Sequence, residues 1–246
     1  MTSSKFLTFG TTPALGTAVQ LLKGWGYSFT DTPDSTVTHL LLPVPTFAPD
    51  GTVHGGGQLE TVLQALPHSI CVIGGNLTSP LLQNRNCIDL LQDAIYLSEN
   101  AYITAHCALR LALSRLPVAL RGCKVLIIGW GRIGKCLAAM LKSMEADVTV
   151  AARKENDRAM LLALGYGAIS TEAIAAAPYR VIFNTAPQMV LPHTPAGALK
   201  IDLASQPGIG GEDVIWARGL PGKDAPETSG ELIARTVIRR LQEDTL

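Results

Sequence analysis

Six residues near the middle of the chain, Gly129 to Gly134, read Gly-Trp-Gly-Arg-Ile-Gly and place three glycines at the spacing GxGxxG. They follow an apolar run, Lys124 to Ile128, and precede a pattern that predicts a helix beginning at Lys135 and continuing through Leu141. In this order of strand, turn and helix, the first glycine allows a tight turn, the second lets backbone approach a pyrophosphate, and the third lets helix pack on strand. The turn predicts a dinucleotide site formed by Gly129, Gly131, Arg132, Ile133 and Gly134.

A second apolar run, residues 146–152, follows at the distance expected for a βαβ unit and leads into Arg153 and Lys154. An NAD site usually carries an acidic residue at this position, where a carboxylate binds the ribose 2′-hydroxyl and repels a 2′-phosphate. A guanidinium pairs with that phosphate in a two-pronged geometry. The pair therefore favours NADP over NAD as the cofactor; the alternative is a solvated Arg-Lys pair on a loop.

Strand and helix patterns alternate along most of the chain, and the predicted fold class is α/β: a doubly wound parallel-sheet Rossmann domain with a second, smaller flavodoxin-like α/β domain. The expected N-terminal domain comprises residues 1–98 together with a returning helix in residues 227–246. The expected dinucleotide domain comprises residues 99–226, with a linking helix at its start. Predicted strands lie at 6–9, 37–42, 69–73, 180–184 and 198–203, and predicted helices at 13–24, 59–66, 99–116, 159–164 and 226–241.

Two of the later predicted strands end in polar residues, Asn184 and Asp202. Open α/β sheets place their ligands at the carboxyl ends of the strands. We therefore expect Asn184, Thr185, Ala186 and Asp202 to contact the cofactor, through backbone and amide groups rather than as catalytic groups.

Bulk properties exclude several classes of partner. Lysine plus arginine and aspartate plus glutamate number 20 each among 246 residues, so no global field draws the chain to nucleic acid or to an anionic membrane. No apolar run approaches the roughly 18 residues that cross a bilayer, and the start of the chain lacks the apolar core of a signal peptide. The five cysteines have no CxxC spacing. We expect a cytoplasmic protein with buried free thiols and no metal site.

Several segments together resemble the family of the dipicolinate synthase A subunit. The most specific is Gly219-Leu220-Pro221-Gly222-Lys223-Asp224-Ala225-Pro226, followed by Thr228 and Gly230. The others are the Gly129 to Gly134 turn, Ile201 to Ser205 with Pro207-Gly208, Leu42 to Pro45, and Asn100-Ala101 with Thr104-Ala105. The resemblance touches most of the chain, which looks like a short member.

The resemblance implies oxidation of a dihydrodipicolinate-type cyclic dicarboxylate to aromatic dipicolinate with a nicotinamide cofactor, in sporulation. It also implies that the partner is a flavoprotein-like B subunit, and we expect a homo-oligomer. The chain departs from the family pattern around the linking helix, where Ile103, His106 and Cys107 replace Pro, Glu and Gly. An imidazole thus stands where the family has an acid, which leaves room for altered substrate chemistry.

Three side chains are candidates for the substrate chemistry. His106 on the linking helix has a side chain that suits a general acid or base. Arg110, one helical turn further on, could hold a substrate carboxylate, and Lys223, in a predicted Pro-Gly-Lys turn, could meet an anionic ligand. We expect the three to converge at the nicotinamide end of the glycine turn. The alternatives are a packed or solvent-facing histidine and charged helix surface.

Three functions remain open from the sequence. The first is an NADP-dependent oxidoreductase acting on a small cyclic dicarboxylate. The second is an enzyme similar to D-2-hydroxyacid dehydrogenases, although Leu203-Ala204-Ser205-Gln206 offers no arginine where that class needs one. The third is a nucleotide-binding subunit without catalysis of its own.

Overall fold

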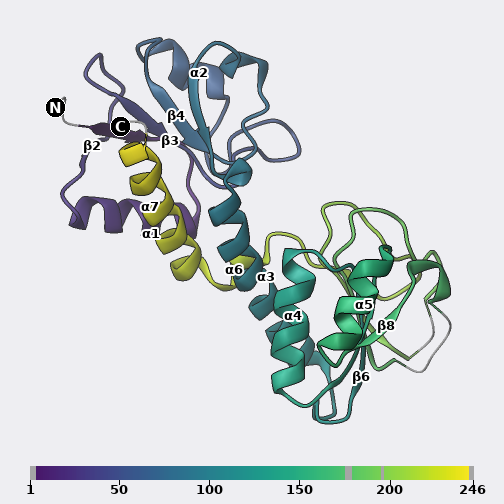
Figure 1. The fold of residues 1–246 in the computed structure, drawn as a ribbon. Helices are drawn as coiled ribbons and strands as arrows, with labels where there is room; N and C mark the ends of the chain where they lie inside the picture. Colours follow the sequence, from purple (N-terminus) through teal and green to yellow (C-terminus); the bar gives the residue numbers. More distant parts are fainter. Residues whose placement is uncertain (1–3, 175–178, 195–196, 244–246) are drawn as a thin grey trace. The chain divides into compact units, whose positions relative to one another are not determined.

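The computed structural model describes residues 4–174, 179–194 and 197–243 (Figure 1). The chain divides into two compact units, Met1–Asn100 with Pro221–Leu246 and Ala101–Leu220. It therefore crosses from one unit to the other twice, within the long helix α3 (Ala94–Arg115) and again after Leu220.

The first unit is built on a parallel sheet. Among the described residues, five strands pair in the order β2-β1-β3-β4-β5, which is the flavodoxin-like order. The central strands are buried apolar runs, as parallel sheets with both faces covered require. The strands are β1 (Lys5–Thr8), β2 (Ser28–Thr30), β3 (His39–Leu41), β4 (Cys71–Gly74) and β5 (Asn86–Asp89).

The helices of this unit are α1 (Pro13–Gly24), α2 (Leu59–Gln64), α6 (Leu220–Asp224) and α7 (Pro226–Glu243), with 3₁₀ turns η1 (Pro80–Leu82) and η2 (Leu90–Gln92). Thr12 caps α1, because its hydroxyl accepts a hydrogen bond from the N–H of Leu15 at 3.2 Å. The terminal helix α7 packs along α1 (Figure 1). A Cβ at Gly230 of α7 would lie 2.5 Å from the carbonyl oxygen of Ala14, so glycine permits this close crossing.

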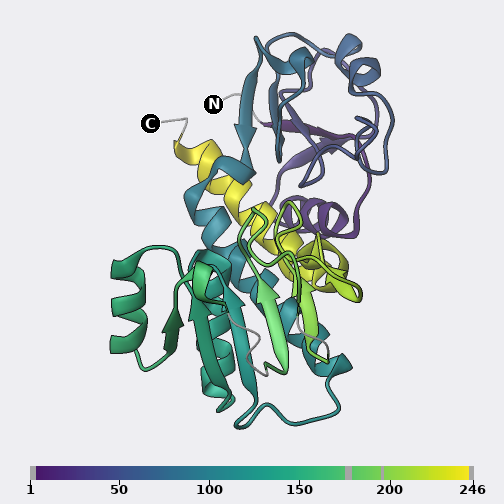
Figure 2. The ribbon, with the colours of Figure 1, turned by 90° about the vertical axis from the view of Figure 1, so that its right-hand side faces the viewer.

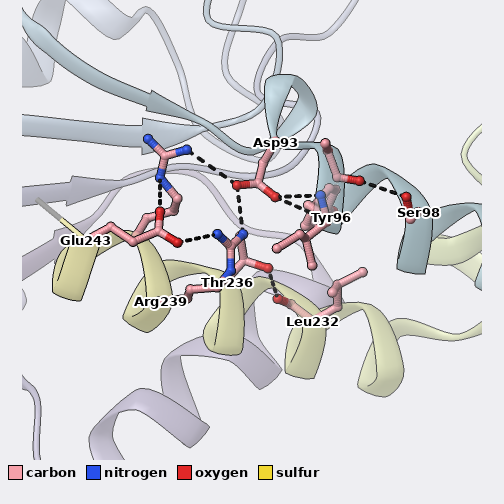
Figure 3. Close-up of polar contacts among 10 residues, drawn as sticks. Asp93, Tyr96, Ser98, Leu232, Thr236, Arg239 and Glu243 are labelled. Atoms are coloured by element: carbon pink, nitrogen blue, oxygen red, sulfur yellow. Dashed lines mark hydrogen bonds and ion pairs between the residues drawn. The ribbon is translucent and has the colours of Figure 1, made fainter.

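Asp93 ties the start of α3 to α7 (Figure 3). One carboxylate oxygen accepts from the N–H groups of Ile95 at 3.0 Å and Tyr96 at 2.8 Å, which caps the helix. The other oxygen lies 2.7 Å from the guanidinium of Arg239 and 3.4 Å from that of Arg240. Burial alone would raise the pKa of Asp93, but the hydrogen bonds from Arg239 and Tyr96 outweigh it and lower the pKa to about 2.

We expect Asp93→Asn to reduce the free energy of unfolding of the first unit by about 2 kcal/mol at pH 7, because the buried charge-assisted bonds are weakened. The stabilising charge is present above the ordinary carboxyl pKa of about 4 and is lost as pH falls towards 2. Urea unfolding at a series of pH values should therefore show the two proteins converging in that window. The control Glu99→Gln, which weakens the exposed pair with Arg235, should change stability by less than about 0.5 kcal/mol. A constant difference down to pH 2 would contradict this account.

The second unit is a Rossmann fold (Figure 2). Its described strands pair in parallel in the order β11-β10-β9-β6-β7-β8, and this order reverses between β6 and β9. The strands are β6 (Lys124–Ile128), β7 (Asp147–Ala151), β8 (Gly167–Ile169), β9 (Val181–Asn184), β10 (Leu199–Asp202) and β11 (Val214–Trp216). The helices α4 (Arg132–Ser143) and α5 (Glu155–Ala163) and the 3₁₀ turn η3 (Thr171–Ala173) lie between them along the chain.

The fold class predicted from the sequence is confirmed, and the five-stranded sheet is the smaller of the two. Several local predictions need correction. The helix expected from Lys135 begins at Arg132, and α5 begins at Glu155 rather than Ala159, because Gly131 and Lys154 adopt the extended backbone of N-cap residues. Lys223 lies in the short helix α6, not in a turn, since proline is tolerated in a first helical turn.

Two further findings concern the surface. No cysteine in the described part of the chain forms a disulfide bond, but Cys87 is exposed rather than buried because it lies on the edge strand β5. No helix within the described ranges is long and apolar enough to cross a membrane.

Candidate dinucleotide site

The glycine turn between β6 and α4 has the geometry that its spacing predicts. Gly129 has φ +101°, a conformation that strains other residues. A Cβ at Gly134 would lie 2.3 Å from the carbonyl oxygen of Gly129, so the third glycine lets the start of α4 pack against the turn. A Cβ at Gly131 would meet nothing within 4 Å. The second glycine is therefore the one that faces open space, where a pyrophosphate can approach.

Thr185, directly after β9, holds this turn in place. Its hydroxyl donates to the carbonyl oxygen of Ile128 at 2.9 Å, and its backbone N–H donates to the same oxygen at 2.8 Å. A Cβ at Gly129 would lie 2.6 Å from the Thr185 hydroxyl. Gly131 caps α4 without a side chain, so the first N–H groups of the helix face the same open space, which favours an anion. The residues present fit a dinucleotide pyrophosphate.

Three cationic side chains lie in the segment that follows β7, two before α5 and one within it. Arg153 and Lys154 are exposed, as expected for groups that could meet a 2′-phosphate. Arg158, which the sequence analysis did not single out, is half-buried, and its guanidinium donates to the carbonyl oxygens of Ala152 at 2.9 Å and Arg153 at 2.8 Å. Arg158 therefore fixes the backbone of Arg153. Its separation of five residues from Arg153 gave no signal of this role.

Asn184 and Asp202, predicted cofactor contacts, are both fully buried at the carboxyl ends of β9 and β10. The Asn184 amide donates to Asp202 at 2.8 Å and to the carbonyl oxygen of Ala186 at 3.0 Å. Asp202 also accepts from the backbone N–H groups of Ala204 at 3.0 Å, Gly208 at 2.7 Å and Ile209 at 3.2 Å. Both side chains thus fix the loops that follow β9 and β10, and these loops form the rim of the site. Any contact with a cofactor would come through those loops.

Trp216 ends β11 beside this rim. Its indole Nε1 donates to the carbonyl oxygen of Ala204 at 3.0 Å, and the guanidinium of Arg218 lies 5.2 Å from the centroid of its ring. Sequence reasoning missed this pair because it did not recognise β11 as a strand. The short run of β-branched and aromatic residues from Val214 to Trp216 is the signal that could have found it.

The three predicted substrate residues are all exposed. His106 and Arg110 lie on the part of α3 that belongs to the second unit, one helical turn apart. Lys223 lies on α6 in the first unit. Their convergence on one ligand stays a prediction.

A cavity of about 590 Å³ lies in the second unit, away from the glycine turn. Its lining includes Arg180 and Asp213, directly before β9 and β11, so it opens at the amino ends of the strands. Dinucleotides bind at the opposite, carboxyl ends. The buried ammonium of Lys200, which also lines it, donates to the carbonyl oxygen of Glu212 at 3.1 Å.

Comparison with known proteins agrees with this geometry. Residues 109–189 match the family model of the D-isomer specific 2-hydroxyacid dehydrogenase, NAD binding domain. The chain is 26% identical to the A subunit of dipicolinate synthase from Bacillus subtilis (strain 168) over 239 residues, which cover 86% of this chain and 80% of that protein.

Two crystal structures share the fold along the whole chain. The A subunit of dipicolinate synthase from Bacillus halodurans is 22% identical, with a TM-score of 0.83 over 97% of this chain and 98% of that one. The corresponding chain of dipicolinate synthase from Bacillus subtilis is 21% identical, with a TM-score of 0.84 over 99% of this chain and 97% of that one. The chain thus resembles the family of the dipicolinate synthase A subunit along most of its length, and residues 109–189 are similar to the NAD binding domain of D-isomer specific 2-hydroxyacid dehydrogenases.

Proposed function

We propose that the protein is an NADP-dependent oxidoreductase that oxidises a dihydrodipicolinate-type cyclic dicarboxylate. The observation that carries the proposal is the glycine turn with open space at Gly131 and cationic side chains at the end of the neighbouring strand β7. The sequence match to the dipicolinate synthase A subunit supports the substrate class. A homo-oligomeric assembly and a flavoprotein-like B subunit belong to the same proposal.

In this proposal the chain's own residues bind and orient the reactants. The N-terminus of α4 and the backbone at Gly131 bind the pyrophosphate. Arg153 and Lys154 bind the 2′-phosphate, while Arg158 keeps the backbone of Arg153 in place. The nicotinamide ring supplies the hydride acceptor. Aromatisation of a dihydropyridine dicarboxylate releases one hydride and one proton, and His106 is the proposed acceptor of that proton.

Coenzyme preference is the first expected result. NADPH should bind at least about tenfold more tightly than NADH, which corresponds to about 1.4 kcal/mol, because one charge-assisted phosphate contact supplies that difference. Arg153→Ala should remove most of the preference and leave NADH affinity unchanged. Fluorescence titration of both coenzymes measures it, with Arg121→Ala, an exposed arginine paired with Glu145 before β6, as the matched control. Equal affinities in the wild type, or a preference that survives in Arg153→Ala, would overturn the NADP assignment.

An assay of the purified chain tests the substrate class. NADPH formation that depends on dihydrodipicolinate, with the chain alone or with a B-type partner, supports the proposal. The match of residues 109–189 to the 2-hydroxyacid dehydrogenase model makes D-2-hydroxyacids the second candidate substrates, and they are tested in parallel. Activity with a D-2-hydroxyacid alone would replace the proposed substrate, and coenzyme binding without any turnover would favour a non-catalytic role.

A further inference from the structure

The segment that follows β11 presents a fixed guanidinium beside the rim of the dinucleotide site. Trp216 pairs in register with Asp202, and after the strand ends the N–H of Ala217 still donates to the Asp202 carbonyl oxygen at 2.8 Å. The indole of Trp216 is fixed to the neighbouring loop by its 3.0 Å bond to Ala204. Arg218 lies over that indole, which orients its guanidinium.

Arg218 has no acidic partner among the residues that the structure describes. Arg218 is exposed, and within the described part of the chain it forms no ion pair with an aspartate or glutamate. Nor do its neighbours supply another fixed cation, since residues 185–198 after β9 and 203–213 after β10 contain no lysine or arginine. Arg153 and Lys154 follow β7, which lies on the other side of the point between β6 and β9 where the strand order reverses. Arg218 is thus the arginine that lies near the carboxyl ends of β10 and β11.

A dinucleotide in a Rossmann fold extends across the point where strand order reverses. With the ribose that carries the 2′-phosphate beside Arg153 at the end of β7, the nicotinamide half extends towards β9 and β10. The loops fixed by Asp202 lie there, and Trp216 and Arg218 lie next to them. A substrate that delivers a hydride to the nicotinamide must bind at this end of the site.

We propose that Arg218, oriented by Trp216, binds one carboxylate of the dicarboxylate substrate; this rests on the proposed function. The planar fork of a guanidinium matches a carboxylate in a bidentate pair, and stacking on an indole limits the rotamers that binding would otherwise have to order. Because the chain has no net charge, a dianionic substrate needs such a local cation. Arg218 is therefore a specificity-determining residue for dicarboxylates over monocarboxylates.

Calorimetric titration of dipicolinate into the NADPH-loaded protein tests this assignment. Arg218→Gln should weaken dipicolinate binding at least tenfold, weaken the monocarboxylate pyridine-2-carboxylate much less, and leave the affinity for NADPH within twofold of the wild type. Arg218→Lys should keep part of the affinity, because it retains the charge but loses the fork. The matched control is Arg180→Gln, an exposed arginine at the amino ends of the strands beside the 590 Å³ cavity, which should bind dipicolinate as the wild type does.

Each other outcome has a distinct meaning. Unchanged dipicolinate binding in Arg218→Gln would overturn the inference and leave the proposed function standing. Loss of binding in Arg180→Gln instead would place the ligand in the amino-edge cavity, and loss of NADPH binding in Arg218→Gln would show that the residue supports the fold or the coenzyme. A wild-type protein that binds NADPH but neither dipicolinate nor dihydrodipicolinate would contradict the proposed substrate class, and the role of Arg218 with it.

Discussion

Gly131→Val should abolish coenzyme binding while leaving the second unit folded. The added side chain meets no protein atom within 4 Å at its Cβ, and φ at this position is −81°, which valine adopts without strain. It would occupy the space where a pyrophosphate approaches the N-terminus of α4. We expect at least a hundredfold loss of affinity for NADPH, about 2.7 kcal/mol, measured by fluorescence titration.

A comparison with Gly134 separates binding from folding. Gly134→Ala places a Cβ 2.3 Å from the carbonyl oxygen of Gly129, so this smaller substitution should lower the melting temperature more than Gly131→Val, which only places a less favoured residue at the N-cap of α4. Thermal melts of the two variants measure this difference. Gly131→Val binding NADPH with wild-type affinity would show that the turn has only a structural role.

Asp202→Ala should destabilise the second unit by about 4 kcal/mol. The fully buried carboxylate accepts hydrogen bonds from the side chain of Asn184 and from three backbone N–H groups, all of which lose their acceptor. Urea unfolding measures the loss, and hydrogen exchange should accelerate first at the amides of Ala204, Gly208 and Ile209. The control Asp147→Ala removes an exposed carboxylate from the start of β7 and should change stability by about 0.5 kcal/mol or less. A loss of less than about 1 kcal/mol in Asp202→Ala would contradict this role.

The sequence predicts the centre of each sheet better than its edges. The central strands β1, β3, β4, β6, β7, β9 and β10 follow apolar runs, because both of their faces are covered. The strands that sequence reasoning missed, β2, β5, β8 and β11, are the edge strands of the two sheets. They have three or four residues, and most of these side chains are not buried, so they lack the longer apolar runs of the central strands.

Some features of the candidate site could also be predicted from the sequence, and others could not. The roles of Gly129 and Gly134 could be predicted, because φ and close packing constrain residue type at a known spacing. The contact of Trp216 with Ala204 could not, since it joins segments whose proximity depends on the completed sheet. The contacts of Arg158 were missed because the helix that carries it, α5, was expected to begin only at Ala159. Asp202 was predicted as a cofactor contact, and three of its four donors come from the loop after β10, whose course no local pattern specifies.

The chain passes from one unit to the other and back, and this order affects how the protein folds during synthesis. Ribosomes deliver residues 101–220 in one continuous stretch, so the Rossmann unit can complete its sheet while the first unit still lacks α7. Until α7 emerges, α1 lacks the helix that packs on it at Gly230. Asp93 likewise lacks the guanidinium of Arg239. The Rossmann unit can therefore mature first, whereas the first unit is completed only after α7 has been translated.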